Sequence, residues 1–245
     1  MIISHRGRGN GLPENSLVAF EAALKRGAGA IECDLRLTAD DQVIVHHGGT
    51  FGASKLGVRR QPLRELAHVA DAEQTEVLRL DRLFEFISEV SAPFYLEVKD
   101  QSPRMASAVV EHIRRGDLWS RVHLVGFPVL INAALRAREE HPRLQVWRIL
   151  LAPALAATRL SLDGSGVLLG WQDSVPFSER LFRATLSAQR LAGLQRRLQH
   201  RGLGVVAGVI TRAEGFDHFR QAGIQDFVTD DVRASVEHLA SRSAV

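Results

Sequence analysis

The sequence predicts an α/β fold, a TIM-like (β/α)8 barrel, because short β-rich runs alternate with longer amphipathic segments from end to end. The length of 245 residues is the usual size of one such barrel. Hydrophobic residues make up 45% and charged residues 24%, as in ordinary globular proteins. We therefore expect a single barrel domain over residues 1–245.

Each element is marked by composition and by boundary residues. Ser16 or Asn15 can cap the first helix, Gly27 fits the position after its end, and Pro128 fits the first turn of a later helix. The expected strands are Ile2–Ser4, Ala30–Leu37, Val43–His46, Phe94–Val98, Val122–Val125, Gln145–Ile149, Val167–Leu169, Val205–Val209 and Asp226–Val228. The expected helices are Ser16–Arg26, Leu80–Val90, Met105–Arg114, Val129–His141, Ser178–Gln199, Ala213–Gly223 and Val232–Ser241.

One long connection, residues 48–76, interrupts the alternation after the third predicted strand. It is rich in glycine, and a helical pattern is visible only near Leu63–Val69. Long loops in compact domains are usually functional lids or small insertions. We expect a short insertion here, either a lid over the site or a contact between subunits.

Charge and composition exclude several classes of partner. The formal net charge is only +3, and the basic residues form short clusters without interleaved aromatics, so no nucleic-acid surface is expected. The apolar stretches are too short for stable membrane insertion. Cys33 is the single cysteine, and the N-terminus lacks the pattern of a signal peptide, so a cytoplasmic location is predicted. The oligomeric state stays open.

Polar residues gather at the expected strand ends. Glu32 and Asp34 share one face of their strand because residues i and i+2 point the same way, and Glu97 and Lys99 do so on another strand. Three carboxylates repel one another unless a cation or a proton intervenes. Oxygen ligands of this kind suit Mg²⁺ or Ca²⁺.

Surface ion pairs could account for each of these groups separately, and Lys99 could be the salt-bridge partner of Glu97. A lone histidine is also more often structural than catalytic. However, the catalytic groups of a barrel gather where its strands end, and His5 and His47 fall near such ends as well. Burying so many polar groups at one rim is costly without a purpose, which favours a functional site.

The order of short motifs resembles that of the glycerophosphodiester phosphodiesterases. The motifs are His5-Arg6-Gly7, Pro13-Glu14-Asn15-Ser16, Glu32-x-Asp34, Thr38-x-Asp40, a strand ending in histidine, and Glu97-x-Lys99. The detailed similarity covers residues 3–47 and 94–99. Residues 222–230 are weakly similar to the closing strand and Thr-Asp of the family.

The resemblance implies a role for each matching residue. Glu32, Asp34 and Glu97 would hold one divalent cation, Mg²⁺ or Ca²⁺. The general acid/base pair would be His5 and His47, and Arg6 and Lys99 would contact the phosphate of the substrate. Glu14 resembles a family position that supports the site. The implied reaction is hydrolysis of a small-molecule glycerophosphodiester to glycerol phosphate and an alcohol, with water or the substrate's own hydroxyl as the nucleophile.

Two departures from the family pattern affect the predicted site. The sequence reads His46-His47-Gly48 where the family has His-Asp, and alignment from Thr38 favours His47 as the inward histidine. Ala207–Thr211 lacks the tryptophan and asparagine usual near the last strands, and Trp171 could supply the missing aromatic group.

These departures leave other functions open. One is a diesterase for a non-standard diester with a bulkier or sugar-containing alcohol. A second is a phospholipase D-like enzyme that forms a cyclic phosphate. A third is a non-catalytic barrel that binds phosphodiesters.

Overall fold

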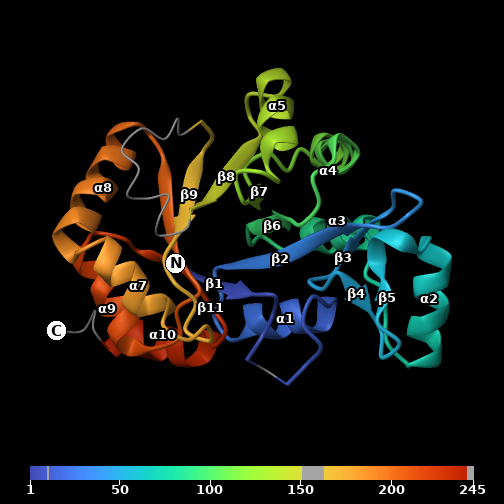
Figure 1. Cartoon of the computed structure of the whole chain (residues 1–245), viewed down its shortest axis with the longest axis horizontal. Helices are drawn as coiled ribbons and strands as arrows, with labels where there is room; N and C mark the ends of the chain where they lie inside the picture. Colours follow the sequence, from blue (N-terminus) through green and yellow to red (C-terminus); the bar gives the residue numbers. More distant parts are fainter. Residues whose placement is uncertain (10, 151–162, 242–245) are drawn as a thin grey trace.

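Parallel strands close into a barrel, which confirms the predicted fold (Figure 1). The computed structural model describes residues 1–9, 11–150 and 163–241. The sheet of 9 strands has the order β1-β11-β10-β9-β8-β7-β6-β2-β3, and β1 also pairs with β2, which closes it. Strand β3 (Val43–Val45) is antiparallel, so the other eight form the barrel. Their bounds are β1 (Ile2–His5), β2 (Ala30–Leu37), β6 (Phe94–Val98), β7 (Val122–Gly126), β8 (Gln145–Leu150), β9 (Gly166–Leu169), β10 (Gly204–Ala207) and β11 (Asp226–Thr229).

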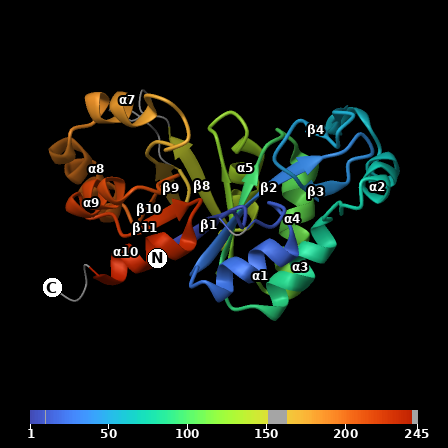
Figure 2. The same ribbon diagram turned by 90° about the horizontal axis from the view of Figure 1, so that it is seen from below.

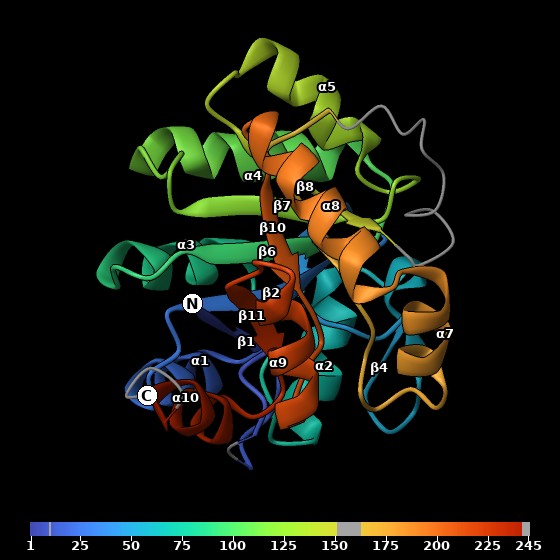
Figure 3. The same cartoon turned by 90° about the vertical axis from the view of Figure 1, so that its left-hand side faces the viewer.

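Amphipathic helices surround this barrel (Figures 1 and 3). In α3 (Leu80–Glu89), for example, Leu80, Leu83, Phe84 and Ile87 are buried, at the spacing of one helix face. None of the helices in the described ranges is long and apolar enough to cross a membrane. Besides α3, the helices outside the insertion are α1 (Leu17–Lys25), α4 (Pro103–Gly116), α5 (Asn132–Glu140), α7 (Ser178–Thr185), α8 (Ala188–His200), α9 (Ala213–Gln221) and α10 (Val232–Ser241).

Local capping signals fix the first helix as predicted. Ser16 is the N-cap of α1, and its Oγ accepts a hydrogen bond from the Ala19 amide at 3.3 Å. Gly27 follows the C-cap Arg26 with φ +96°, a conformation that favours glycine. Asn15, the alternative cap, instead lies in the site described below.

The third predicted strand is not a barrel strand, and this corrects the expectation of uniformly parallel strands. Strand β3 runs antiparallel to the far end of β2, with Leu35 opposite Val45. Only residues 38–42 join the two strands. A parallel crossover needs a dozen or more residues, so this short turn can only form a hairpin.

Two helix predictions were wrong in detail. The segment Ser178–Gln199 forms two helices, α7 and α8, because the chain breaks at buried Leu186 and Ser187 caps the second helix. Pro128 does not begin a helix, since α5 starts at Asn132 and the residues before it form a turn in which the Leu130 amide donates to the Phe127 carbonyl.

The insertion folds around a small core of its own. It contains the hairpin β4 (Thr50–Phe51) and β5 (Leu56–Gly57), a 3-10 turn and α2 (Leu63–Ala72), which confirms the predicted helical stretch. Phe51, Val58, Leu66 and Ala70 pack together with Ile44 of β3. Figures 2 and 3 show the insertion and α7 at the same end of the barrel.

Candidate active site

A large cavity opens at the carboxyl ends of the barrel strands, where catalytic groups gather in this fold. Its volume is about 770 Å³. Six of the seven side chains predicted for the site line it, and the seventh, Asp34, is completely buried directly behind them. The six are His5, Arg6, Glu32, His47, Glu97 and Lys99.

Three buried carboxylates form a compact group beside this cavity. Glu32 and Asp34 come from β2 and Glu97 from the neighbouring β6, where Glu97 lies opposite Asp34. One oxygen of each lies within 4.8 Å of the others, and all three residues are buried. Among the described residues, no hydrogen bond reaches either carboxylate oxygen of Glu32 or Oε1 of Glu97. These unpaired oxygens fit a divalent cation, which would supply the missing positive charge.

Burial and mutual repulsion act most strongly on Glu32. Desolvation, followed by the charges of Asp34 and Glu97, holds the pKa of Glu32 well above its usual range. The cations Arg6 and Lys99 oppose this shift without reversing it. A bound cation would favour the ionised form of Glu32, so ion binding and proton release are coupled here.

Asp34 has the opposite environment, because donors surround it. Burial alone would raise its pKa, but a hydrogen bond with His47, the charges of Lys99 and Arg6, and a hydrogen bond from Asn15 hold the pKa of Asp34 well below its usual range. Its Oδ2 lies 2.9 Å from Arg6 Nε, 2.9 Å from Asn15 Nδ2 and 3.3 Å from His47 Nδ1. Asp34 is therefore ionised and organises the cationic side of the site.

Lys99 bridges two of the three carboxylates. Its Nζ lies 2.7 Å from Glu97 Oε2 and 3.0 Å from Asp34 Oδ1. Burial would lower the pKa of Lys99, but the charges of Glu97 and Asp34 raise it, so the ammonium group stays charged. The salt bridge with Glu97 that the sequence suggested is present, and Lys99 also lines the cavity.

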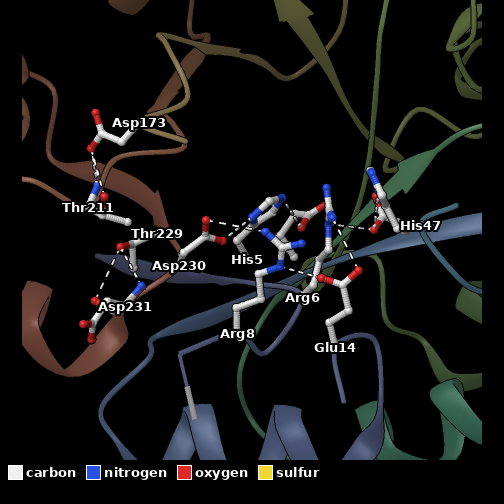
Figure 4. A network of polar contacts seen from close by, with 12 residues as sticks. His5, Arg6, Arg8, Glu14, His47, Asp173, Thr211, Thr229, Asp230 and Asp231 are labelled. Carbon is white, nitrogen blue, oxygen red and sulfur yellow. Dashed lines mark hydrogen bonds and ion pairs between the residues drawn. The ribbon is translucent and has the colours of Figure 1, made fainter. Parts of the chain in front are cut away.

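His5 is held by an acidic residue that directly follows the last strand of the barrel (Figure 4). Its Nδ1 lies 2.6 Å from Asp230 Oδ1, and its Nε2 lies 3.8 Å from Glu32 Oε2. Burial would raise the pKa of Asp230, but its hydrogen bond to His5 and the charges of His5 and Arg8 lower it. An ionised Asp230 can only accept, so Nδ1 of His5 donates and Nε2 is left facing the cavity.

The loop after β1 places two arginines around Glu14 (Figure 4). Arg8 Nε donates to Glu14 Oε2 at 2.5 Å, and Arg6 Nη1 lies 3.6 Å from Glu14 Oε1. Arg6 and Asn15 adopt left-handed backbone conformations, with φ +59° and +58°. The backbone N–H of Asn15 donates to the backbone carbonyl of Arg6 at 2.9 Å. Such conformations cost energy in residues other than glycine and occur often at functional sites.

The two adjacent histidines point in different directions. His47 lines the cavity beside Asp34, whereas His46 Nε2 lies 2.8 Å from the Thr50 carbonyl oxygen and its ring packs on Phe51 of the insertion. Alternation at the end of a strand explains this division, because neighbouring side chains point to opposite faces. In the described structure no residue of 48–76 lines the cavity.

Three residues of the site received no role from the sequence. Asp230 was visible only through the weak similarity of Thr229-Asp230 to the closing motif of the family. Asn15 was considered chiefly as a helix cap, although it holds Asp34. Arg8 lies in an irregular glycine-rich turn and gave no periodic signal. These roles depend on contacts between distant parts of the chain, which local patterns do not encode.

Comparisons with known proteins show the family of the chain. The family model described as "Glycerophosphoryl diester phosphodiesterase family" matches residues 5–147, which is more than half of the chain. A glycerophosphodiester phosphodiesterase from Caldanaerobacter subterraneus subsp. tengcongensis is 23% identical over 245 residues, covering 94% of each protein. A relative from Mycobacterium tuberculosis is 26% identical over 176 residues, and the match covers 65% of this chain and only 63% of that relative's length.

Solved structures share the fold. Glycerophosphodiester phosphodiesterase from Thermotoga maritima superposes with a TM-score of 0.70 at 18% identity, covering 96% of each chain. A phosphodiesterase from Oleispira antarctica, solved in complex with the product sn-glycerol-3-phosphate, superposes with a TM-score of 0.74 at 17% identity, covering 98% of this chain and 96% of that one. At these identities the likeness shows the barrel alone.

Proposed function

The chain belongs to the glycerophosphoryl diester phosphodiesterase family, and we propose that it hydrolyses a small glycerophosphodiester to glycerol phosphate and an alcohol. The observation that carries the proposal is the buried group Glu32, Asp34 and Glu97, with its unpaired oxygens, next to His5 and His47. The product held by the Oleispira antarctica protein supports glycerol phosphate as one product.

Glu32, Asp34 and Glu97 would hold one divalent ion, Mg²⁺ or Ca²⁺, both of which prefer oxygen ligands. When bound, such an ion polarises a non-bridging phosphate oxygen and offsets the negative charge that develops on the phosphate. Lys99 offsets the repulsion between Asp34 and Glu97 and orients their oxygens, because its ammonium group contacts both.

His5 and His47 would move the protons of the reaction. Asp230 holds His5 in the tautomer that presents Nε2 to the cavity, and its carboxylate stabilises the ring when it is protonated. His47 lies on the other side of the carboxylate group, 42% exposed and in contact with Asp34. One histidine takes a proton from the nucleophile and the other gives one to the departing alkoxide.

Two arginines provide charge for the phosphate. Arg6 is buried against Asp34 and Glu14, so its guanidinium is fixed in place before substrate binds. Arg8 is 36% exposed and lines the cavity. Planar guanidinium groups suit phosphate oxygens because they offer several donors in a fixed arrangement.

Hydrolysis assays with and without metal test the proposal. The protein is incubated with glycerophosphocholine, glycerophosphoethanolamine or bis-p-nitrophenyl phosphate in EDTA, Mg²⁺ or Ca²⁺. We expect release of glycerol phosphate or nitrophenol that needs one of the ions and disappears in His5→Ala. His200→Ala, at an exposed position on α8, is the matched control and should keep full activity. Full activity of the metal-free protein, or of His5→Ala, would contradict the proposed mechanism.

A further inference from the structure

We propose that the alcohol esterified in the substrate carries a linear hydrocarbon chain, which lies along an apolar wall of the active-site cavity. The apolar wall is formed by Phe127, Ile149, Leu168, Trp171, Val175 and Leu181, all of which line the cavity. This inference rests on the proposed function and names the class of its leaving group.

The cavity is divided into a charged side and an apolar side. Charged and titratable groups come from β1, β2, β6 and the segments after β1, β3 and β6, whereas the apolar wall comes from β8, β9 and the segments after β7 and β9. Gly208 and Val209, beyond β10, continue the apolar side, where the family pattern led us to expect tryptophan and asparagine. The phosphate would therefore occupy one side, with an esterified alcohol extending over the other.

Few polar groups are available on the apolar side. Among the described residues, the polar side chains that line it are Gln172, Ser174 and Ser178. The Ser178 hydroxyl is already engaged, since its Oγ lies 2.7 Å from the Gln172 carbonyl oxygen. A sugar or polyol would lose its hydration here with few partners in return, which is unfavourable. A hydrocarbon chain loses no hydrogen bonds and gains by leaving water.

The apolar wall is held in shape by Asp173, which ties the segment after β9 to the segment after β10 (Figure 4). Trp171 Nε1 donates to Asp173 Oδ1 at 2.7 Å, and the Thr211 amide donates to Asp173 Oδ2 at 2.7 Å. Arg212 contacts Asp173 and also Glu179 of α7, at 3.0 and 2.6 Å. The wall is preformed, so an apolar chain would bind without first ordering it.

The apolar wall continues to the protein surface. Val175 is 47% exposed and Leu181 is 58% exposed, and both also line the cavity. Phe177, between them in sequence, is 79% exposed. Large apolar side chains gathered at the rim of a cavity mark a route for an apolar ligand. A chain longer than the cavity could leave the barrel past Val175 and Leu181.

A homologous series of diesters tests the inference. The substrates are glycerol phosphodiesters of ethanol, butanol, hexanol and octanol, kept below micelle-forming concentrations and assayed with the activating ion. We expect kcat/KM to rise by about twofold to fourfold per methylene, since a buried methylene favours binding by up to this factor. A flat or falling dependence on chain length would overturn the inference.

Substitutions on the apolar wall provide a second test of the inference. Leu181→Gln and Val175→Gln lie at exposed positions that folding does not require to be apolar. Each should lower the ratio of kcat/KM for the octyl diester to that for the ethyl diester by about fivefold. The matched control is Val18→Gln, on α1, which is 55% exposed and outside the cavity, and the ratio should not change. An unchanged ratio in the two wall variants would count against the inference.

Direct binding separates the inference from the proposed function. Turnover of every diester with no effect of chain length leaves the proposed function intact and removes the inference. Absence of turnover across the series contradicts the proposed function, and calorimetry with n-alkyl phosphates then decides the inference. Tighter binding of octyl phosphate than of ethyl phosphate supports the apolar wall as a chain-binding surface, and equal affinity overturns it.

Discussion

Two polar layers lie inside the barrel, and they differ in whether their atoms find partners. Strand β6 contributes to both, because Tyr95 and Glu97 are two residues apart and point inward on the same face. The lower layer contains Tyr95, His123 of β7 and Trp147 of β8. The upper layer contains the carboxylates Glu32, Asp34 and Glu97.

The lower layer is uncharged and packed. The rings of Tyr95 and His123 stack with centroids 4.5 Å apart, and Trp147 Nε1 donates to His123 Nδ1 at 3.1 Å. Burial lowers the pKa of His123 to about 4, so this ring is neutral at neutral pH. Gly166 and Gly204 leave room for the Trp147 ring, since a Cβ on either would lie 2.5 Å or less from it.

The upper layer is charged, and some of its oxygens lack donors in the described structure. The lower layer shows that polar side chains buried in this barrel can satisfy one another. The fold therefore does not require the unpaired oxygens of the upper layer. Buried charges without partners cost stability, and a site that keeps them is adapted to a ligand.

The largest expected effect is that of Glu32→Gln. The variant removes one proposed ligand, so kcat should fall by about 1000-fold or more. The free energy of unfolding of the metal-free protein should rise by about 1–3 kcal/mol at neutral pH, because a neutral amide avoids the cost of burying a charge. Hydrolysis assays with metal and urea denaturation in EDTA measure the two changes.

The size of the gain in stability depends on pH. Because the pKa of Glu32 is higher in the folded protein than in the unfolded chain, ionisation of its carboxyl group opposes folding. This penalty begins above the pKa that Glu32 has in the unfolded chain, and it grows as pH rises toward its pKa in the folded protein. The gain in Glu32→Gln should therefore vanish below about pH 4, where the carboxyl is neutral in both states. If the metal-free variant were less stable than wild type at neutral pH, Glu32 would not be an unfavourable buried charge, and the two layers would not differ as described.

The next effect is that of Asp230→Asn, which tests a positioning residue. An amide at this position can donate to His5 Nδ1 and favour the wrong tautomer, so kcat should fall by about 100-fold. Affinity for the divalent ion should stay within about twofold, because Asp230 is not one of the proposed ligands. Steady-state kinetics and calorimetry on the same preparation check both. An equal loss of ion affinity would show that Asp230 acts on the metal site.

His123→Gln probes the lower layer through acid stability. Because the folded pKa of His123 is depressed to about 4, its neutral form stabilises the fold above the unfolded pKa, and this contribution is lost as pH falls from about 6.5 to about 4. Wild type should lose about 2 kcal/mol more than His123→Gln over this range, after allowance for partial exposure. Denaturant unfolding at several pH values measures the difference. His200→Gln is the surface control, and identical pH profiles for wild type and His123→Gln would contradict the account.

The smallest effect is expected for Tyr95→Phe. Its ring can still stack on His123, so kcat/KM should change by less than about threefold. The assay with glycerophosphocholine checks this expectation. A large loss of activity would mean that the lower layer takes part in the reaction, and the distinction between the two layers would fail.

The sequence predicts the barrel strands well because their signals are local. Ala30–Leu37 and Phe94–Val98 match β2 and β6 residue for residue, since buried strands read as continuous apolar runs interrupted by the site residues. The antiparallel setting of β3 and the break between α7 and α8 were missed. The first depends on the length of one turn, and the second on a buried leucine between two helices.

The residues of the site also differ in whether the sequence predicts them. Residues within or just after strands, such as Glu32, Glu97 and His47, can be placed at one rim from topology alone. The pairing of His5 with Asp230 joins residues 225 positions apart, and the Asp173 contacts that hold Trp171 join two separate loops. Such contacts exist only once the barrel has closed, so no local pattern could predict them.

Calorimetric titration of Mg²⁺ and Ca²⁺ into metal-free protein measures whether the upper layer binds a divalent ion. Wild type and the lower-layer variant Tyr95→Phe should each bind one ion per chain, and Glu32→Gln should lose that binding. Equal ion binding by wild type and Glu32→Gln, or none by wild type, would contradict this role of the upper layer.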